Sequence, residues 1–275
     1  MPEIQRFFAN TAALPAMPEV AHRLLRTFNM PNLAMGELAD LIGQDQGLSV
    51  KLLRLANSAR YSPRQAIATI KDAANCIGLQ SLRDLALAAC VAGTFPVAPG
   101  FDRLRFWRQC LASAGHARVL AQACDLDPDS SYLAGMLLRT GELLMLMTEP
   151  EGIVLAESRA TLPDSLMDHE MALLRCNHAE VTAELARRWR FPQAMVDGLQ
   201  AAGDPLAARP FSKLGAVLRI ASVLADAGDR GLPALATLLE TQGALVAHLH
   251  LDLDWLGQHL QPYELLCSGV DQMLH

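Results

Sequence analysis

The chain is poor in aromatic and β-branched residues, and this argues against a β-sheet fold. Phe, Trp and Tyr make up 5% of its 275 residues, while hydrophobic residues make up 51%. Ala and Leu are abundant and favour helices, whereas strands are typically rich in Val, Ile, Thr and aromatic residues. We therefore predict an all-α fold. A chain of this length can bury a sizeable core in one large domain or in two small ones.

The chain also lacks the features of several large classes of protein. Lys and Arg total 23 against 29 Asp and Glu, a net charge of −6, and no segment gathers the basic residues into a stripe that could follow a phosphate backbone. The first ten residues, MPEIQRFFAN, lack the basic stretch and apolar run of a secretion signal. The most apolar stretch, 85–95, is far shorter than the roughly 20 residues that cross a bilayer. We expect a cytoplasmic chain that binds neither nucleic acid nor membrane directly.

Motifs for redox, nucleotide or nucleophilic chemistry are missing too. The six cysteines are scattered without a CxxC pair, as is typical of reduced core thiols. The sequence contains no GxxxxGK[ST] phosphate loop, no GxGxxG fingerprint and no GxSxG elbow. No histidines have HExxH spacing, and the His169–Glu170 pair is expected to be exposed. We expect no cofactor.

Apolar residues at helical spacing predict about 12 to 14 helices. In a first block, residues 10–96, five helices are expected at 18–29, 34–43, 48–57, 69–77 and 81–94. The Gly- and Pro-rich segment VAGTFPVAPGF marks a joint to a second block, residues 100–230. Six helices are expected there, at 101–124, 130–148, 164–176, 178–189, 192–202 and 211–227. Residues 231–275 are expected to form a C-terminal extension of two or three helices.

Two pairs of residues have the spacing of N-terminal helix caps. Ser81 is followed by Asp84, and Asn177 is followed by Glu180. In such a pair the first side chain accepts a backbone N–H of the first turn, and an acidic third residue reaches back to the cap. The two pairs predict helix starts at 81 and 178.

Three stretches carry a family resemblance: LPAMPEV at 14–20, DQGLSVKLLRLANSARYS at 45–62 and IGLQSLRDLAL at 77–87. They resemble the HD-related output domain (HDOD) of bacterial signalling proteins, and the second is close to the family signature that ends in Leu-Ala-Asn-Ser-Ala. Segments 106–114, 132–143 and 176–192 extend the resemblance to about residues 14–226. The resemblance implies an HD-like helical bundle preceded by a five-helix block. It also implies a degenerate relative of the HD and HD-GYP metal phosphohydrolases.

The signature residues also have a structural interpretation. Asp45 precedes a predicted helix, so we expect it to cap that helix rather than to act as a catalytic acid. Asn57 and Ser58 lie at the end of the same helix, where short polar side chains bond to free backbone groups. We expect all three side chains to stabilise turns by hydrogen bonding to the backbone.

The resemblance also locates the metal ligands of the parent phosphohydrolases. The first His corresponds to Gln109, the His-Asp pair to Arg139 and Thr140, and the distant Asp to Ser222. An amide and two hydroxyls are weak ligands, and a permanently protonated Arg repels a cation. We therefore expect no bound metal and no enzymatic activity.

The relic of that site could still form a pocket. We expect it to be lined by Gln109, Arg139, Thr140, His178 and Ser222. Arg139 offers a forked donor to a small anion such as a phosphate or a carboxylate. In the alternative, an internal carboxylate satisfies Arg139; Glu142, three residues on, has the spacing for a local ion pair. His178 matches an extra metal ligand of the HD-GYP branch, but alone it cannot hold a metal tightly, and we expect a buried, hydrogen-bonded side chain.

These features predict a non-catalytic signalling or output module that acts by binding another protein. The resemblance implies a partner that is a separate signalling chain, such as one with receiver, GGDEF or EAL domains. The alternative is a residual phosphohydrolase or phosphodiesterase acting on a nucleotide. A transcription factor is disfavoured by the acidic balance. The aliphatic residues of the extension are expected to close the core rather than to contact the partner: Leu232, Leu235, Leu238, Leu239, Leu245, Val246 and Leu249.

Overall fold

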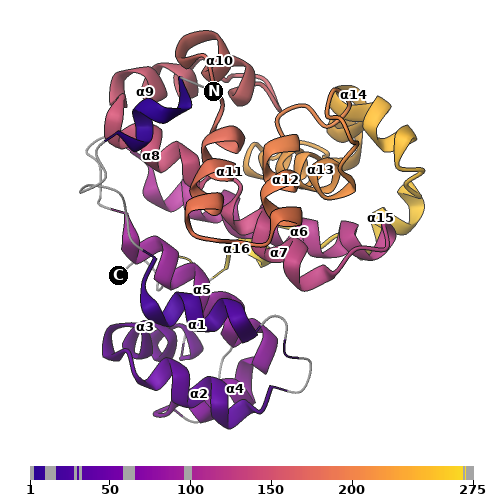
Figure 1. The fold of residues 1–275 in the computed structure, drawn as a ribbon. Helices are drawn as coiled ribbons and strands as arrows, with labels where there is room; N and C mark the ends of the chain where they lie inside the picture. Colours follow the sequence, from indigo (N-terminus) through magenta and orange to yellow (C-terminus); the bar gives the residue numbers. More distant parts are fainter. Residues whose placement is uncertain are drawn as a thin grey trace. The chain divides into compact units, whose positions relative to one another are not determined.

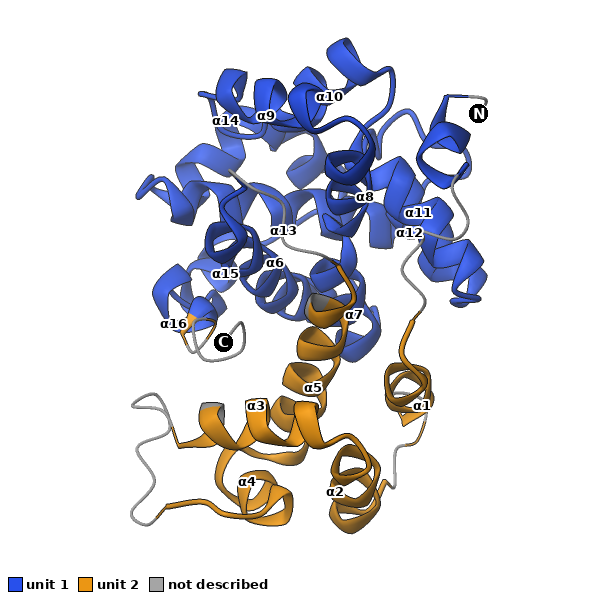
Figure 2. Ribbon diagram, turned by 90° about the vertical axis from the view of Figure 1, so that its left-hand side faces the viewer, with its two compact units in different colours: residues 1–14, 98–267 blue, residues 15–97, 268–275 orange. Residues whose placement is uncertain are grey.

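The computed structural model describes residues 3–9, 17–27, 30, 33–57, 66–95, 101–268 and 270. Within these residues the secondary structure is helical and contains no β-strand, which confirms the all-α class. The chain divides into two compact units (Figure 2). Unit 2 comprises residues 15–97 and 268–275, and unit 1 comprises residues 1–14 and 98–267.

Unit 2 is the expected five-helix block. Its helices are α1 (Glu19–Thr27), α2 (Met35–Gly43), α3 (Gln46–Ala56), α4 (Ile70–Ile77) and α5 (Leu79–Thr94). Helix α4 packs against α2, α3 and α5, and α5 also packs against α1. Leu24, Ile42 and Leu52 are almost fully buried. The apolar stripes that predicted these helices therefore form the core of the unit.

Unit 1 is built around two long helices, α6 (Arg103–Ala123) and α13 (Lys213–Asp229), which pack against each other (Figure 1). The other elements of unit 1 are η1 (Ile4–Phe8), α7 (Pro128–Leu137), α8 (Thr140–Thr148), α9 (Pro150–Arg159), α10 (Leu166–Leu174), α11 (His178–Arg188), α12 (Gln193–Ala201), α14 (Ala234–His248), α15 (Leu253–His259) and α16 (Tyr263–Cys267). Helix α7 packs on α6, α11 on α8 and α12, and α9 on α10. Because α6 and α13 each pack against several other helices, their side chains are well placed to line a pocket shared with those helices.

Two predictions for the region 126–163 were wrong. The expected single helix 130–148 is broken between Leu137 and Thr140, where Arg139 has φ −91° and ψ 0° and a second helix begins. Helix α9 was not expected at all, although Pro150 stands at its start, where a missing N–H costs nothing. These extra breaks explain why the chain has more and shorter helices than predicted.

The two predicted caps had different outcomes. Asn177 and Glu180 form a complete capping box at the start of α11, as predicted. The pair Ser81 and Asp84 does not cap a helix, because α5 already begins at Leu79 and both residues lie within it. Gly78, with φ +88°, turns the chain between α4 and α5, and only glycine adopts that conformation without strain.

The C-terminal helices belong to unit 1 and partly close its core. Leu238, Leu245 and Val246 of α14 are buried, as expected of a closing face. Leu232 and Leu239, in contrast, are 40% and 45% exposed. Helix α16 packs on α6 and α13, and Tyr263 lies in a buried cluster there. The expected closing face is therefore shorter than the sequence pattern indicated.

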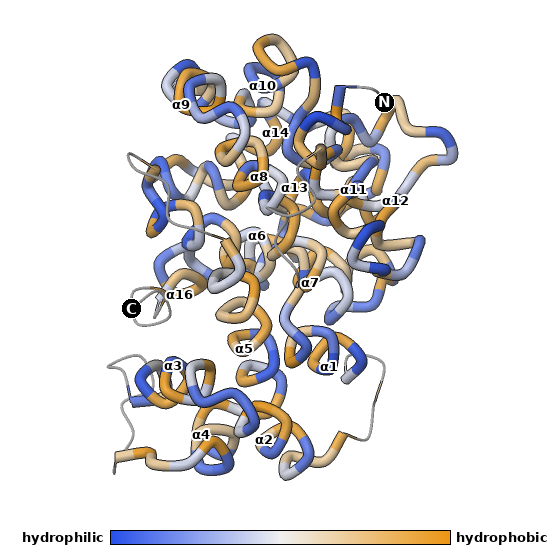
Figure 3. Tube along the Cα trace, turned by 60° about the vertical axis from the view of Figure 1, so that its left-hand side comes forward, coloured by the Kyte–Doolittle hydropathy of each residue, from blue (hydrophilic) through white to orange (hydrophobic). Residues whose placement is uncertain are grey.

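Hydropathy varies along individual helices rather than between long segments. Blue hydrophilic and orange hydrophobic residues alternate along the helices in Figure 3, the pattern of helices that bury one face. None of the described helices combines the length and the apolar character that crossing a bilayer requires.

Candidate functional site

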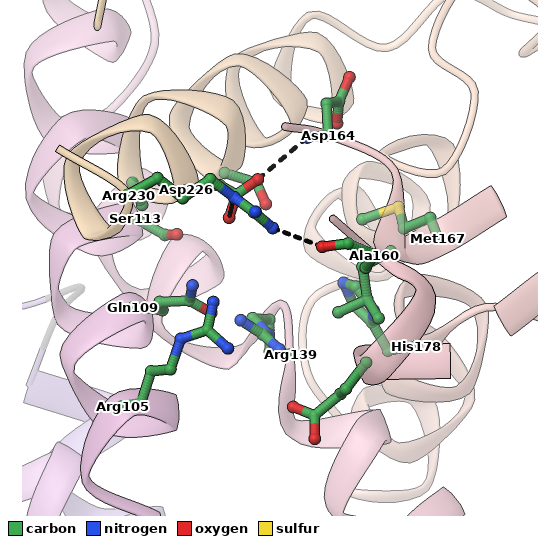
Figure 4. A pocket seen from close by; sticks show the side chains of 14 residues that line it. Arg105, Gln109, Ser113, Arg139, Ala160, Asp164, Met167, His178, Asp226 and Arg230 are labelled. Carbon is green, nitrogen blue, oxygen red and sulfur yellow. Dashed lines mark hydrogen bonds and ion pairs between the residues drawn. The ribbon is translucent and has the colours of Figure 1, made fainter. Parts of the chain in front are cut away.

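A small cavity of about 50 Å³ opens in unit 1 among side chains from α6, α9, α11 and α13 (Figure 4). Of the five residues predicted to share a relic pocket, Gln109, Arg139, His178 and Ser222 line this cavity. Thr140 does not line it, because its hydroxyl is buried and donates to the carbonyl of Leu137 at 2.7 Å. The volume holds a few water molecules or one small ion.

Arg139 is held by the carboxylate that the sequence spacing indicated. Its Nε and Nη2 both donate to Glu142 Oε2, at 2.9 and 2.6 Å. Arg139 is 8% exposed and Glu142 is fully buried. Burial lowers the pKa of Arg139, but the attraction of Glu142 outweighs that effect and holds the pKa above its ordinary value. A fixed cation is therefore built into the pocket wall.

The break before α8 places Arg139 at the cavity. The N–H of Gly141 donates to Thr182 Oγ1 at 2.8 Å, and that hydroxyl donates to the carbonyl of Leu138 at 2.8 Å. A Cβ atom on Gly141 would collide with the backbone of α11 at His178 and Thr182. Glycine here therefore lets the start of α8 lie directly against α11.

His178 is fixed by a buried carboxylate from α10. Its Nδ1 lies 3.0 and 2.8 Å from the two oxygens of Glu170, and its backbone N–H donates to Glu170 Oε2 at 2.8 Å. The prediction that the His169–Glu170 pair is exposed was wrong: Glu170 is fully buried and His169 is half-buried. Within the described residues, the other ring nitrogen of His178, Nε2, is buried without a hydrogen-bond partner.

Glu157 of α9 adds a second carboxyl group beside Glu142. Burial, followed by the nearby charge of Glu142, raises the pKa of Glu157 to about 8. Arg139 and Arg105 oppose this rise without cancelling it. The carboxyl of Glu157 is therefore protonated at neutral pH.

Asp229 links two pocket residues to the C-terminal extension. Its Oδ2 accepts from Arg105 Nε at 2.7 Å and from Gln109 Nε2 at 3.1 Å. Its Oδ1 accepts from the hydroxyl of Tyr263 in α16 at 2.9 Å. The polar heads of Arg105 and Gln109 are thus positioned by the same carboxylate.

Further charged residues of the pocket were missed by the sequence reasoning. Asp226 accepts from Arg230 Nε at 2.8 Å, and Arg219 lies 3.0 Å from Asp164. Helical spacing could have found Asp226, four residues after Ser222, and likewise Arg105, four residues before Gln109. Asp164 is the first residue of the predicted helix 164–176, but in the structure it precedes α10, which begins at Leu166, so helical spacing did not mark it.

The residues that the resemblance assigns to the metal ligands are chemically unsuited to a cation. Gln109, Arg139, Thr140 and Ser222 offer an amide, a guanidinium and two hydroxyls, and the guanidinium is bonded to the carboxylate of Glu142. A different group, Glu142, Glu170 and His178, offers three ligand atoms that all lie within 4.8 Å of one another. Sequence spacing could not have indicated it, since the three residues come from three separate helices.

Two signature residues of unit 2, Asp45 and Asn57, bond to backbone groups at the ends of α3. Asp45 Oδ1 accepts from Leu48 N at 2.9 Å, which caps α3. The side chain of Asn57 donates to the carbonyls of Leu53 and Ile67 and accepts from Ile67 N, each at 2.8 Å. Ser58 lies outside the described residues. Asp45 and Asn57 therefore use their polar atoms on the backbone.

Comparisons with known proteins give a consistent result. The family model of the HDOD domain matches residues 14–205. An uncharacterized protein of Treponema pallidum (strain Nichols) is 30% identical over 193 residues, which cover 68% of this chain and 37% of that protein. A crystal structure of a candidate phosphohydrolase from Shewanella amazonensis SB2B is 28% identical, covers 98% of both chains and has a TM-score of 0.76. A crystal structure of a candidate signal transduction protein from Marinobacter aquaeolei VT8 is 21% identical and has a TM-score of 0.79. The match covers 100% of this chain and 64% of that protein's chain.

Proposed function

The chain belongs to the HDOD domain family, and from that premise we propose that it is a non-catalytic signalling module that acts by binding another protein. We assign this role to residues 10–230, in two blocks at 10–96 and 100–230, and treat 231–275 as an extension. The partner is a separate signalling chain, such as one with receiver, GGDEF or EAL domains. The module works in the cytoplasm without contacting nucleic acid or membrane.

One observation carries the non-catalytic part of this proposal. The family resemblance assigns the His-Asp pair of the parent enzymes to Arg139 and Thr140, and Glu142 holds the guanidinium of Arg139 by two hydrogen bonds. Hydrolysis in the parent enzymes needs a divalent ion that activates water. A buried cation in the pocket wall disfavours a second cation beside it, because like charges in a poorly solvated site repel strongly.

The experiment combines elemental analysis of the purified chain with a phosphodiesterase assay in added Mn²⁺. We expect less than stoichiometric metal and no turnover of a cyclic dinucleotide or an aryl phosphodiester. Stoichiometric metal with turnover that disappears in His178→Ala would overturn the proposal. Thr140→Ala serves as the matched control, since this residue does not line the pocket.

A second experiment addresses the partner. We expect the chain to retain a protein that carries a receiver, GGDEF or EAL domain from an extract of its source organism. Reciprocal capture with that purified protein should then give a complex of defined stoichiometry. Failure to recover any such protein would contradict the interaction role.

The residual phosphohydrolase remains the alternative because one cluster favours it. Glu142, Glu170 and His178 bring two carboxylates and an imidazole together, the donor types that bind Mn²⁺, Fe²⁺ or Zn²⁺. His178 Nε2 is buried and has no hydrogen-bond partner among the described residues. Loss of metal in Glu170→Gln as well as in His178→Ala would favour this alternative.

A further inference from the structure

Two guanidinium groups face the same side of the pocket. In Figure 4 the side chains of Arg105 and Arg139 converge beside Gln109. Asp229 accepts from Nε of Arg105, and Glu142 accepts from Nε and Nη2 of Arg139. No acceptor within the described ranges meets the two Nη atoms of Arg105 or Nη1 of Arg139. Donors with positive charge therefore remain unused where the two side chains meet.

Both groups remain charged despite their proximity. Burial and the charge of Arg139 lower the pKa of Arg105, but the hydrogen bond and charge of Asp229 outweigh them, so the pKa lies above its ordinary value. The two cations repel each other across the pocket. An anion between them would relieve that repulsion and accept the unused N–H groups.

Resting on the non-catalytic role proposed above, we propose that Arg105 and Arg139 form a binding site for one phosphate group, either free or as the end of a small metabolite. The remaining N–H groups of two guanidinium groups, one on α6 and one in the turn before α8, suit a tetrahedral oxyanion, which presents oxygens in several directions. The hydroxyls of Ser113 and Ser222 also line the cavity and provide uncharged donors.

The cavity volume limits what the site holds. About 50 Å³ accommodates a few waters or one oxyanion, whereas pockets that enclose a whole small molecule measure about 300–1,000 Å³. A phosphate group therefore fits inside, and any attached sugar or base lies outside. Arg105 marks the open end, since its side chain is 43% exposed while that of Arg139 is 10% exposed.

The test measures binding of inorganic phosphate to the full chain at pH 7 by calorimetry, with chloride at equal ionic strength as the reference. We expect one saturable site. Arg105→Gln should weaken binding at least tenfold, and Arg103→Gln, two positions away on α6, should leave it unchanged. Absence of saturable binding, or equal affinity in Arg105→Gln, would overturn the proposal. A nucleoside monophosphate in a parallel titration shows whether a free ion or a terminal group is preferred.

Because this titration contains no protein partner, its failure leaves the interaction role intact, and failure to find a partner leaves this site intact.

Discussion

Polar residues of the family serve different purposes in the two units. In unit 2, Asp45 and Asn57 direct their polar atoms to the backbone at the ends of α3. In unit 1, Arg139 and His178 line a cavity, and Nε2 of His178 is buried without a partner in the described part of the chain. Backbone capping satisfies a residue completely, whereas side chains left unsatisfied around a cavity are available to a ligand. Ligand binding is therefore expected in unit 1, and fold maintenance in unit 2.

The largest test of this comparison is Glu142→Ala. It leaves the Arg139 guanidinium buried without a counter-ion, which should lower the free energy of unfolding by about 3–5 kcal/mol. Urea denaturation measures the loss. The double variant Arg139→Met with Glu142→Leu should recover most of it, because it removes both charges; a double variant as unstable as the single one would rule out the ion-pair explanation.

Asn57→Ala should have a smaller effect, about 1–2 kcal/mol, because it removes three hydrogen bonds from a solvent-accessible turn. Asn57→Asp keeps the acceptor for Ile67 N and loses the two donated bonds, so its stability should be intermediate. If Asn57→Ala proved more destabilising than Glu142→Ala in urea denaturation, the contrast between the units would be broken.

Asp45→Ala should lower the free energy of unfolding by about 1 kcal/mol through loss of the α3 cap. Asp45→Ser or Asp45→Asn retains a capping oxygen and should stay close to the unaltered chain. Thermal denaturation of the three variants checks the order. Equal destabilisation by Ser and Ala would show that Asp45 contributes something other than a cap.

The last prediction concerns pH. Glu157 has a pKa of about 8 in the folded chain, against an ordinary value of 4.5, so the folded state holds one more proton between these values. The contribution of Glu157 to stability is therefore complete below pH 4.5, declines as the pH rises to 8 and is constant above it. Denaturation midpoints from pH 5 to pH 9 should decline less in Glu157→Gln; equal slopes would refute the assignment.

The sequence predicted the fold class because apolar periodicity is a local property. It could not predict the break at Arg139, which depends on the bond from Gly141 to Thr182, forty-one residues away. Four of the five predicted pocket residues line one cavity because the resemblance fixed their alignment. Glu157, which lines the cavity, and Glu170, which holds His178, were missed because their roles depend on helix packing that a single sequence does not reveal.

Asp229 connects the cavity residues Arg105 and Gln109 to α16, the last helix of unit 1. One of its oxygens holds Arg105 and Gln109, and the other holds Tyr263. A ligand that changes the bond between Asp229 and Arg105 therefore also changes the free energy with which α16 packs on the bundle. By thermodynamic reciprocity, a change in the packing of α16 changes the affinity for that ligand by the same factor. Comparing the phosphate affinity of Tyr263→Phe with that of the unaltered chain measures this coupling. Through it, an anion bound in the cavity would change the stability of α16.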